Sequence, residues 1–271
     1  MKKTLYLVLI VVLLIVFGIS AFFVGRYVIE SKREADRFDQ LAQMKDQATS
    51  QTTQHTQPPQ TTAATIPQET AEATTVPTEP QILEEYAALY EMNNDMVGWI
   101  QIEGTKLNYP VMQTPNDLNY YLNRNFDKVD SQSGAIYARE DCDINEPSDN
   151  ITIYGHNMAN GSMFAALNSY TNKTYWENNN IISFDTLTEK HTYKIFAVFK
   201  TSANIGQGFS YHQFVDAQNQ AEFDEFVSTC KKLAFYDTGI TPVYGDKLIC
   251  LSTCEYTLEN GRLVVCAVRW S

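Results

Sequence analysis

The chain has 271 residues, of which 44% are hydrophobic, and a formal net charge of −12 at pH 7. An acidic balance of this size argues against nucleic acid or an anionic lipid surface as the main partner. The five cysteines include no C-x-x-C pair, which argues against a metal site of the zinc type. The function therefore has to be inferred from motifs.

The N-terminus carries one apolar run long enough to span a membrane. Residues 5–24 contain no charged side chain, and about 20 apolar residues span the hydrocarbon core of a bilayer. A cleaved signal peptide is the alternative, but its apolar region is usually only about 7 to 15 residues long. No A-x-A site closes the run either. We therefore expect residues 1–44 to form an uncleaved membrane anchor with its juxtamembrane segment.

The next segment has the composition of a stalk. Residues 45–80 are rich in Thr, Gln, Pro and Ala and have few large apolar side chains, so they cannot bury enough apolar surface to fold. Positive charges flank residues 5–24 on both sides and leave the orientation open. The short N-terminal tail and the disordered stalk favour a single-pass protein of the cell membrane, with one extracellular folded domain over residues 81–271.

Short strands dominate the expected elements of that domain. Apolar periodicity predicts helices over 82–90, 162–170 and 218–235. Alternating or continuous apolar runs predict strands over 97–102, 107–111, 134–138, 150–154, 181–185, 192–200, 247–254 and 262–270. Many short strands with few helices between them predict a mainly β fold, a barrel with peripheral helices.

A cysteine ends one of the last two strands, and an arginine begins the other. Cys254 closes the apolar run from Leu248, and Arg262 starts the next run. The thiolate is the nucleophilic form of cysteine, and a neighbouring cation favours it. An antiparallel pair with Cys254 opposite Arg262 also places Cys250 opposite Cys266. We expect free thiols there, because cross-strand disulfides are geometrically demanding.

One of the four histidines has a setting suited to acid–base catalysis. His55 falls in the stalk, while His191 in a hairpin turn and His212 in a polar loop are expected to be solvated. His156 follows the strand over 150–154 and a glycine, so the sheet would hold it beside an open cleft. Taken alone it favours a structural role. Together with Cys254 it is a candidate general acid and base.

These residues resemble the signature of the sortase family, class B in particular. The resemblance rests on Tyr154-Gly155-His156-Asn157-Met158, on Leu251-Ser252-Thr253-Cys254 and on Arg262, and it covers most of residues 82–271. It implies an eight-stranded sortase β-barrel and a membrane-anchored cysteine transpeptidase, of the peptidase and hydrolase class, outside a Gram-positive cell. Cys250 stands where the family usually has threonine.

The resemblance also implies a substrate and further site residues. Such enzymes cut the C-terminal sorting signal of secreted proteins and join the new carboxyl end to an amine of the peptidoglycan precursor. By the same resemblance, five residues would line the groove for the sorting signal: Leu122, Tyr154, Ser252, Thr253 and Glu255.

The expected chemistry needs only three side chains. Cys254 attacks a peptide carbonyl and forms a thioester, His156 protonates the departing amine, and Arg262 stabilises the oxyanion or holds the substrate backbone. No metal or organic cofactor is required. The alternatives are a class B pilin polymerase using a lysine amine and a non-catalytic surface-binding module with structural cysteines. A papain-like hydrolase is a weaker one, because its cysteine normally precedes its histidine in the sequence.

Overall fold

The computed structural model describes residues 2–55, 81–204 and 206–271. Within these ranges, eight strands close into one barrel in the order β1-β2-β3-β4-β7-β8-β6-β5. The mainly β fold expected from the sequence is therefore confirmed. The strands are β1 (Met96–Gln101), β2 (Asn108–Met112), β3 (Ile136–Ala138), β4 (Asn150–Tyr154), β5 (Ile181–Thr186), β6 (Thr192–Ser202), β7 (Leu248–Glu255) and β8 (Gly261–Arg269).

Neighbouring strands are antiparallel except for two parallel pairs, β2 with β3 and β4 with β7. The pair β7–β8 has the expected register, with Cys254 opposite Arg262 and Cys250 opposite Cys266. The Sγ atoms of Cys250 and Cys266 lie 2.6 Å apart, and both thiols are free.

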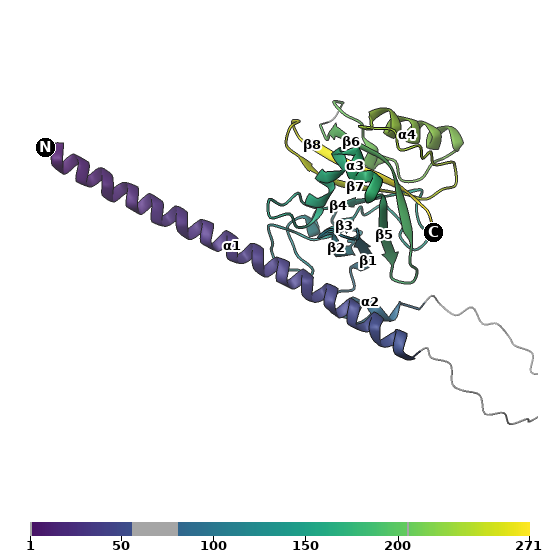
Figure 1. Cartoon of the computed structure of the whole chain (residues 1–271), viewed down its shortest axis with the longest axis horizontal. Coiled ribbons are helices and arrows are strands. Elements are labelled where there is room, and N and C mark those ends of the chain that lie inside the picture. Colours follow the sequence, from purple (N-terminus) through teal and green to yellow (C-terminus); the bar gives the residue numbers. More distant parts are fainter. Residues whose placement is uncertain (1, 56–80, 205) are drawn as a thin grey trace, which may run out of the picture.

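Helices and short 3₁₀ segments surround the barrel (Figure 1). The helices are α1 (Lys2–His55), α2 (Glu84–Met92), α3 (Lys173–Asn178) and α4 (Gln220–Leu233), and the 3₁₀ segments are η1 (Tyr120–Leu122), η2 (Phe164–Thr171) and η3 (Tyr211–Gln213). The helix expected over 162–170 is thus a 3₁₀ segment.

Two apolar layers explain why β6, β7 and β8 read as continuous apolar runs. One set of alternating side chains, including Ile249 and Val265, fills the barrel interior. The opposite set, including Phe199 and Val264, packs outside the barrel against Phe226 and the other buried residues of α4. A strand that is buried on both faces loses the polar alternation of a surface strand.

The N-terminal helix extends further than the sequence suggests. Figure 1 shows α1 as one long helix whose first half projects away from the barrel and whose second half lies beside α2. In the described part of the chain, α1 is the one helix long and apolar enough to cross a membrane. Residues 45–55, expected to begin the disordered stalk, are helical. Residues 56–80 lie outside the described residues.

The helix continues because it packs on the domain. Phe38 is 4% exposed and Leu41 is fully buried, and both belong to the same apolar core as the barrel. The ring of Phe38 meets that of Tyr109 edge-on at 5.2 Å between centroids. Tertiary burial stabilises a helix well beyond its intrinsic propensity. The domain boundary expected at residue 81 therefore leaves out residues that complete the core.

Candidate active site

Two neighbouring strands bring His156 and Cys254 to the same end of the barrel. In the parallel pair β4–β7, Tyr154 lies beside Ser252, and the Gly155 N–H donates to the Ser252 carbonyl at 3.2 Å. His156 and Cys254 each stand two residues beyond that pair. The amide of Asn157 donates to the Cys254 carbonyl at 2.9 Å, which fixes the histidine loop against the end of β7.

Arg262 joins them from the other side of β7. It is paired with Cys254 on β7 and with Thr201 on β6, so its backbone is held on both edges. Its guanidinium donates to the carbonyl oxygens of Gly261 at 2.9 Å and Asn260 at 3.2 Å. The three residues predicted to be catalytic are therefore contributed by three separate parts of the sequence to one location.

The trio lines a cleft of about 320 Å³. Four of the five residues expected to bind substrate share this lining: Leu122, Tyr154, Ser252 and Thr253. The hydroxyl oxygen of Thr253 is buried and has no hydrogen-bond partner among the described residues. Burial raises the pKa of the Tyr154 phenol to about 12 against the lowering effect of Arg139, so this phenol stays protonated. The Tyr154 phenol, which is half-buried, is thus a hydroxyl group on the cleft wall.

His156 is held by a backbone carbonyl and by close packing behind it. Its Nε2 lies 2.7 Å from the carbonyl oxygen of Leu122. A Cβ atom at Gly155 would lie 2.5 Å from Cδ1 of Ile136 and 2.7 Å from Cγ of Phe164. Such contacts are far inside van der Waals distance. Only glycine therefore fits at position 155, directly before His156.

Glu255 does not line the cleft and is not a solvated loop charge. Its carboxylate accepts from Lys200 Nζ at 2.6 Å, from the Thr257 hydroxyl at 2.6 Å and from the Leu258 N–H at 3.1 Å. Burial alone would raise its pKa, but these hydrogen bonds outweigh burial and lower the pKa to about 2. Glu255 therefore stabilises the turn between β7 and β8 as a carboxylate.

Two histidines expected to be solvated have other environments. His212 on η3 lines the catalytic cleft, and its pKa is lowered by burial and by the charges of Arg139 and Arg262. His191 is 7% exposed, and Arg269 Nη2 lies 2.6 Å from its Nδ1. The expectation was wrong for His191, which tertiary packing covers, whereas His212 is half-buried at the cleft wall.

Arg139 and Tyr211, which were not expected from the sequence, share the cleft lining. The hydroxyls of Tyr211 and Ser252 lie 2.5 Å apart. Arg139 comes one residue after β3 and pairs with Asp141 at 2.6 Å. No motif marked either residue, because each enters the cleft from a segment whose course depends on distant contacts.

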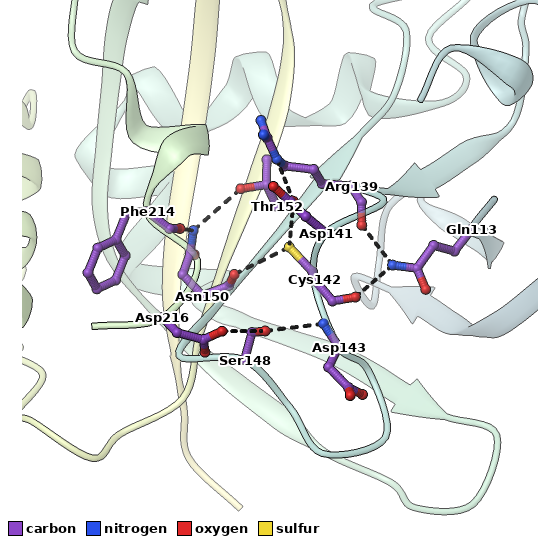
Figure 2. A network of polar contacts seen from close by, with 10 residues as sticks. All are labelled: Gln113, Arg139, Asp141, Cys142, Asp143, Ser148, Asn150, Thr152, Phe214 and Asp216. Carbon is purple, nitrogen blue, oxygen red and sulfur yellow. Dashed lines mark hydrogen bonds and ion pairs between the residues drawn. The ribbon is translucent and has the colours of Figure 1, made fainter. Parts of the chain in front are cut away.

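A polar network ties these two segments together (Figure 2). Gln113 donates to the carbonyls of Arg139 at 2.7 Å and Cys142 at 2.8 Å. The Asn150 amide, at the start of β4, donates to the carbonyl of Phe214, two residues after His212, at 2.8 Å. The Arg139 N–H donates to the Thr152 carbonyl of β4 at 2.9 Å, so the walls that carry Arg139 and His212 are both fixed to the strand that leads to His156.

Among residues 2–55, 81–204 and 206–271, no three His, Cys, Asp or Glu side chains are grouped as metal ligands would be.

Comparisons with known proteins point to one family. The family model described as Sortase domain matches residues 100–270. Sortase B of Staphylococcus aureus is 26% identical over 97% of this chain and 95% of its own length. Sortase B of Listeria monocytogenes is 31% identical over 72% of this chain and 78% of its own length.

Solved structures show the same fold. A Staphylococcus aureus sortase B–substrate complex matches with a TM-score of 0.73 at 24% identity, covering 90% of this chain and 99% of that one. A Bacillus anthracis protein described as similar to sortase B matches with a TM-score of 0.63 at 30% identity, covering 71% of this chain and 85% of that one.

Proposed function

Because the chain belongs to the sortase family, as a class B member and hence a cysteine transpeptidase, we propose that it anchors secreted proteins to the cell wall. In this proposal it cleaves a C-terminal sorting signal and transfers the new carboxyl end to an amine of the peptidoglycan precursor. The observation that carries the proposal is the meeting of His156, Cys254 and Arg262 in one cleft.

The reaction proceeds in two acyl transfers. The Cys254 thiolate attacks the scissile carbonyl, and the carbonyl oxygen takes the negative charge next to Arg262. The carbon–nitrogen bond then breaks, His156 gives its proton to the departing amine, and a thioester remains. An incoming amine attacks the thioester, His156 takes its proton, and the thiolate leaves as the new amide forms. Atoms and protons balance without a cofactor.

We assign the sorting signal to the cleft wall formed by Leu122, Tyr154, Ser252 and Thr253. The protonated Tyr154 phenol supports a contact to a polar peptide. Glu255 receives a different role, because its carboxylate is already committed to Lys200 and the adjoining turn. It would shape the cleft without touching substrate.

The location proposed for the enzyme follows from α1. Its exposed apolar residues over 5–24 would cross the membrane once, with the barrel on the extracellular side. Secreted substrates and the wall precursor are then within its reach.

The decisive experiment uses the full chain in detergent micelles with a library of sorting-signal peptides and a soluble amine. We expect cleavage and amide formation, no thioester in Cys254→Ala, and a rate lowered about 100- to 10,000-fold in His156→Ala. Cys250→Ala, on the same strand but outside the cleft, serves as the matched control and should retain activity. Equal turnover by Cys254→Ala would refute the proposal.

The same assay can separate the two classes of acceptor. A peptidoglycan-type amine and a lysine ε-amine on a pilin-like peptide compete for one thioester. Preferred transfer to the lysine peptide would favour a pilin polymerase instead.

A further inference from the structure

One face of α1 contacts the two segments that hold His156. Ser31, Glu34 and Arg37 follow one another at intervals of three residues, which places them on one side of the helix. Each makes a polar contact to a different point of the catalytic domain. Phe38, the next residue, enters the core beside them. This face begins seven residues after the apolar run ends at Val24.

The first segment is the turn over residues 123–130, directly after Leu122. Glu34 accepts from the Asn125 amide with both carboxylate oxygens at 3.1 Å. Arg37 donates two hydrogen bonds to the Asp127 carboxylate, at 2.6 and 2.7 Å. The Leu122 carbonyl, which accepts from His156 Nε2, is therefore continuous with a turn clamped by α1.

The second segment is the histidine loop over residues 156–163. Near its tip, the Asn160 amide donates to the Ser31 hydroxyl at 2.7 Å. At its end, the Met163 N–H donates to the hydroxyl of Tyr109 at 3.0 Å, and the Tyr109 ring packs on Phe38. Met163 has φ of 55°, an unusual conformation for a residue other than glycine, which surrounding structure must enforce.

Hydrogen bonds within the loop connect these contacts with α1 to the backbones of His156 and Cys254. Asn157 and Met163 form a β-bridge across the loop, and the Phe164 N–H donates to the His156 carbonyl at 2.9 Å. Asn157 also donates to the carbonyl of Cys254. A continuous set of packed and hydrogen-bonded groups thus runs from Phe38 on α1 through Tyr109 and Met163 to the backbone of both catalytic residues.

We propose that the docked face of α1, residues Ser31, Glu34, Arg37 and Phe38, is a positioning element of the active site that sets the placement of His156 relative to Cys254. The anchor helix then does more than retain the enzyme at the membrane. This inference rests on the proposed function for the roles of the two catalytic residues, but not on the identity of the substrate or acceptor.

The test compares variants of the full chain in detergent micelles. The triple variant Ser31→Ala, Glu34→Ala, Arg37→Ala removes the polar contacts and keeps Phe38 and good helix formers. The control Arg26→Ala, Glu30→Ala removes an ion pair that α1 makes within itself. Ser31→Thr, compared with Ser31→Ala, tests rescue by a residue that retains the hydroxyl.

Four quantities separate positioning from stability. They are kcat and KM for peptide transfer, the pH profile of Cys254 alkylation by iodoacetamide, and the melting temperature. We expect the triple variant to lower kcat about tenfold with KM changed less than about twofold. The alkylation profile should differ from that of the parent chain, because the surroundings of the thiol change. The control and Ser31→Thr should behave as the parent chain.

Each alternative outcome is decisive. A lower melting temperature with unchanged kcat and an unchanged alkylation profile would give α1 a purely stabilising role and overturn the proposal. Alkylation needs no substrate, so it still tests the positioning role if the parent chain transfers none of the peptides offered. In that case the proposed function is refuted, and the positioning role is judged from alkylation alone.

Discussion

The carbonyl oxygen of Leu122 lies 2.7 Å from Nε2 of His156. A carbonyl oxygen can only accept a hydrogen bond, so Nε2 carries a proton in both charge states of the ring. In the neutral ring, Nδ1 is then the unprotonated nitrogen. In the proposed mechanism, proton exchange with the departing and incoming amines falls to Nδ1 for as long as this hydrogen bond is kept.

This relationship predicts the tautomer of the neutral imidazole. Nitrogen NMR of the ¹⁵N-histidine-labelled chain above the titration range should show a protonated Nε2 and an unprotonated Nδ1 for His156. His156→Ala identifies the signal. A protonated Nδ1 would mean that the Leu122 carbonyl does not hold the ring in solution.

Gly155→Ala should impair both catalysis and stability. The added Cβ would meet Ile136 and Phe164 at 2.5 and 2.7 Å, and such overpacking costs about 1 to 3 kcal/mol. The backbone next to His156 has to shift to relieve it, so kcat should fall at least about tenfold. Gly25→Ala, where no atom lies within 4 Å of the new Cβ, is the control. Unchanged kcat in Gly155→Ala would show that the site adapts freely.

Alkylation of the native chain should modify Cys254 ahead of the other four cysteines. Cys254 is half-buried, whereas Cys142, Cys230, Cys250 and Cys266 are buried. Burial also raises the pKa of Cys142 to about 12 and raises the pKa values of Cys250 and Cys266, so their reactive thiolate forms are scarce.

Mass spectrometry after iodoacetamide treatment checks this prediction. In the native chain the label should appear on Cys254, and after unfolding without a reductant it should appear on all five cysteines. Failure of Cys250 and Cys266 to react until a reductant is added would reveal a disulfide between β7 and β8.

Removing Arg139 should raise the pKa of His212. Burial and then the positive charges of Arg139 and Arg262 hold this pKa below its usual value of 6.5. In Arg139→Met, the midpoint of the His212 NMR titration should move towards 6.5. Arg124→Met, which removes a cation that pairs with Asp130, should leave it in place. An unchanged midpoint in Arg139→Met would mean that the charge of Arg139 does not act on the pKa of His212 in solution.

The same shift predicts how stability depends on pH. The folded pKa is lowered, so below pH 6.5 the unfolded chain takes up a proton at His212 that the folded chain does not. The free energy of unfolding should therefore decline as pH falls below 6.5. This decline should be less steep in Arg139→Met. Urea unfolding at a series of pH values measures the difference in slope.

A chain limited to residues 81–271 should be less stable than one that starts at residue 27. The shorter chain lacks Phe38 and Leu41, which are buried in the core. Loss of the burial of these two side chains should lower the free energy of unfolding by about 4 kcal/mol. Urea unfolding of both chains gives the comparison. Equal stability would mean that α1 adds little to the core.

The strand residues allowed the sequence to predict much of the barrel. Placing Cys254 opposite Arg262 predicted the register of β7 and β8, because paired residue numbers in an antiparallel ladder have a constant sum. The parallel pairing of β4 with β7 was beyond reach, since strands that are far apart in sequence give no local sign of being neighbours.

The errors share one cause, which is burial by distant segments. The polar composition of residues 45–55 pointed to a disordered stalk, yet the helix through Phe38 and Leu41 is already held by the core and continues into them. His191 and His212 lie in sequences that read as surface loops. Their partners, Arg269 and Arg139, lie more than 70 residues away along the chain.

Cys254 and Arg262 stand on strands that are hydrogen-bonded along both edges, whereas Arg139 and His212 reach the cleft from segments outside the strands. The backbones of Cys254 and Arg262 are therefore held by the sheet itself, whereas the placement of Arg139 and His212 depends on contacts made outside the sheet. Substitutions of Arg139 or His212 can change this part of the cleft wall while the sheet keeps the thiol and the guanidinium in register.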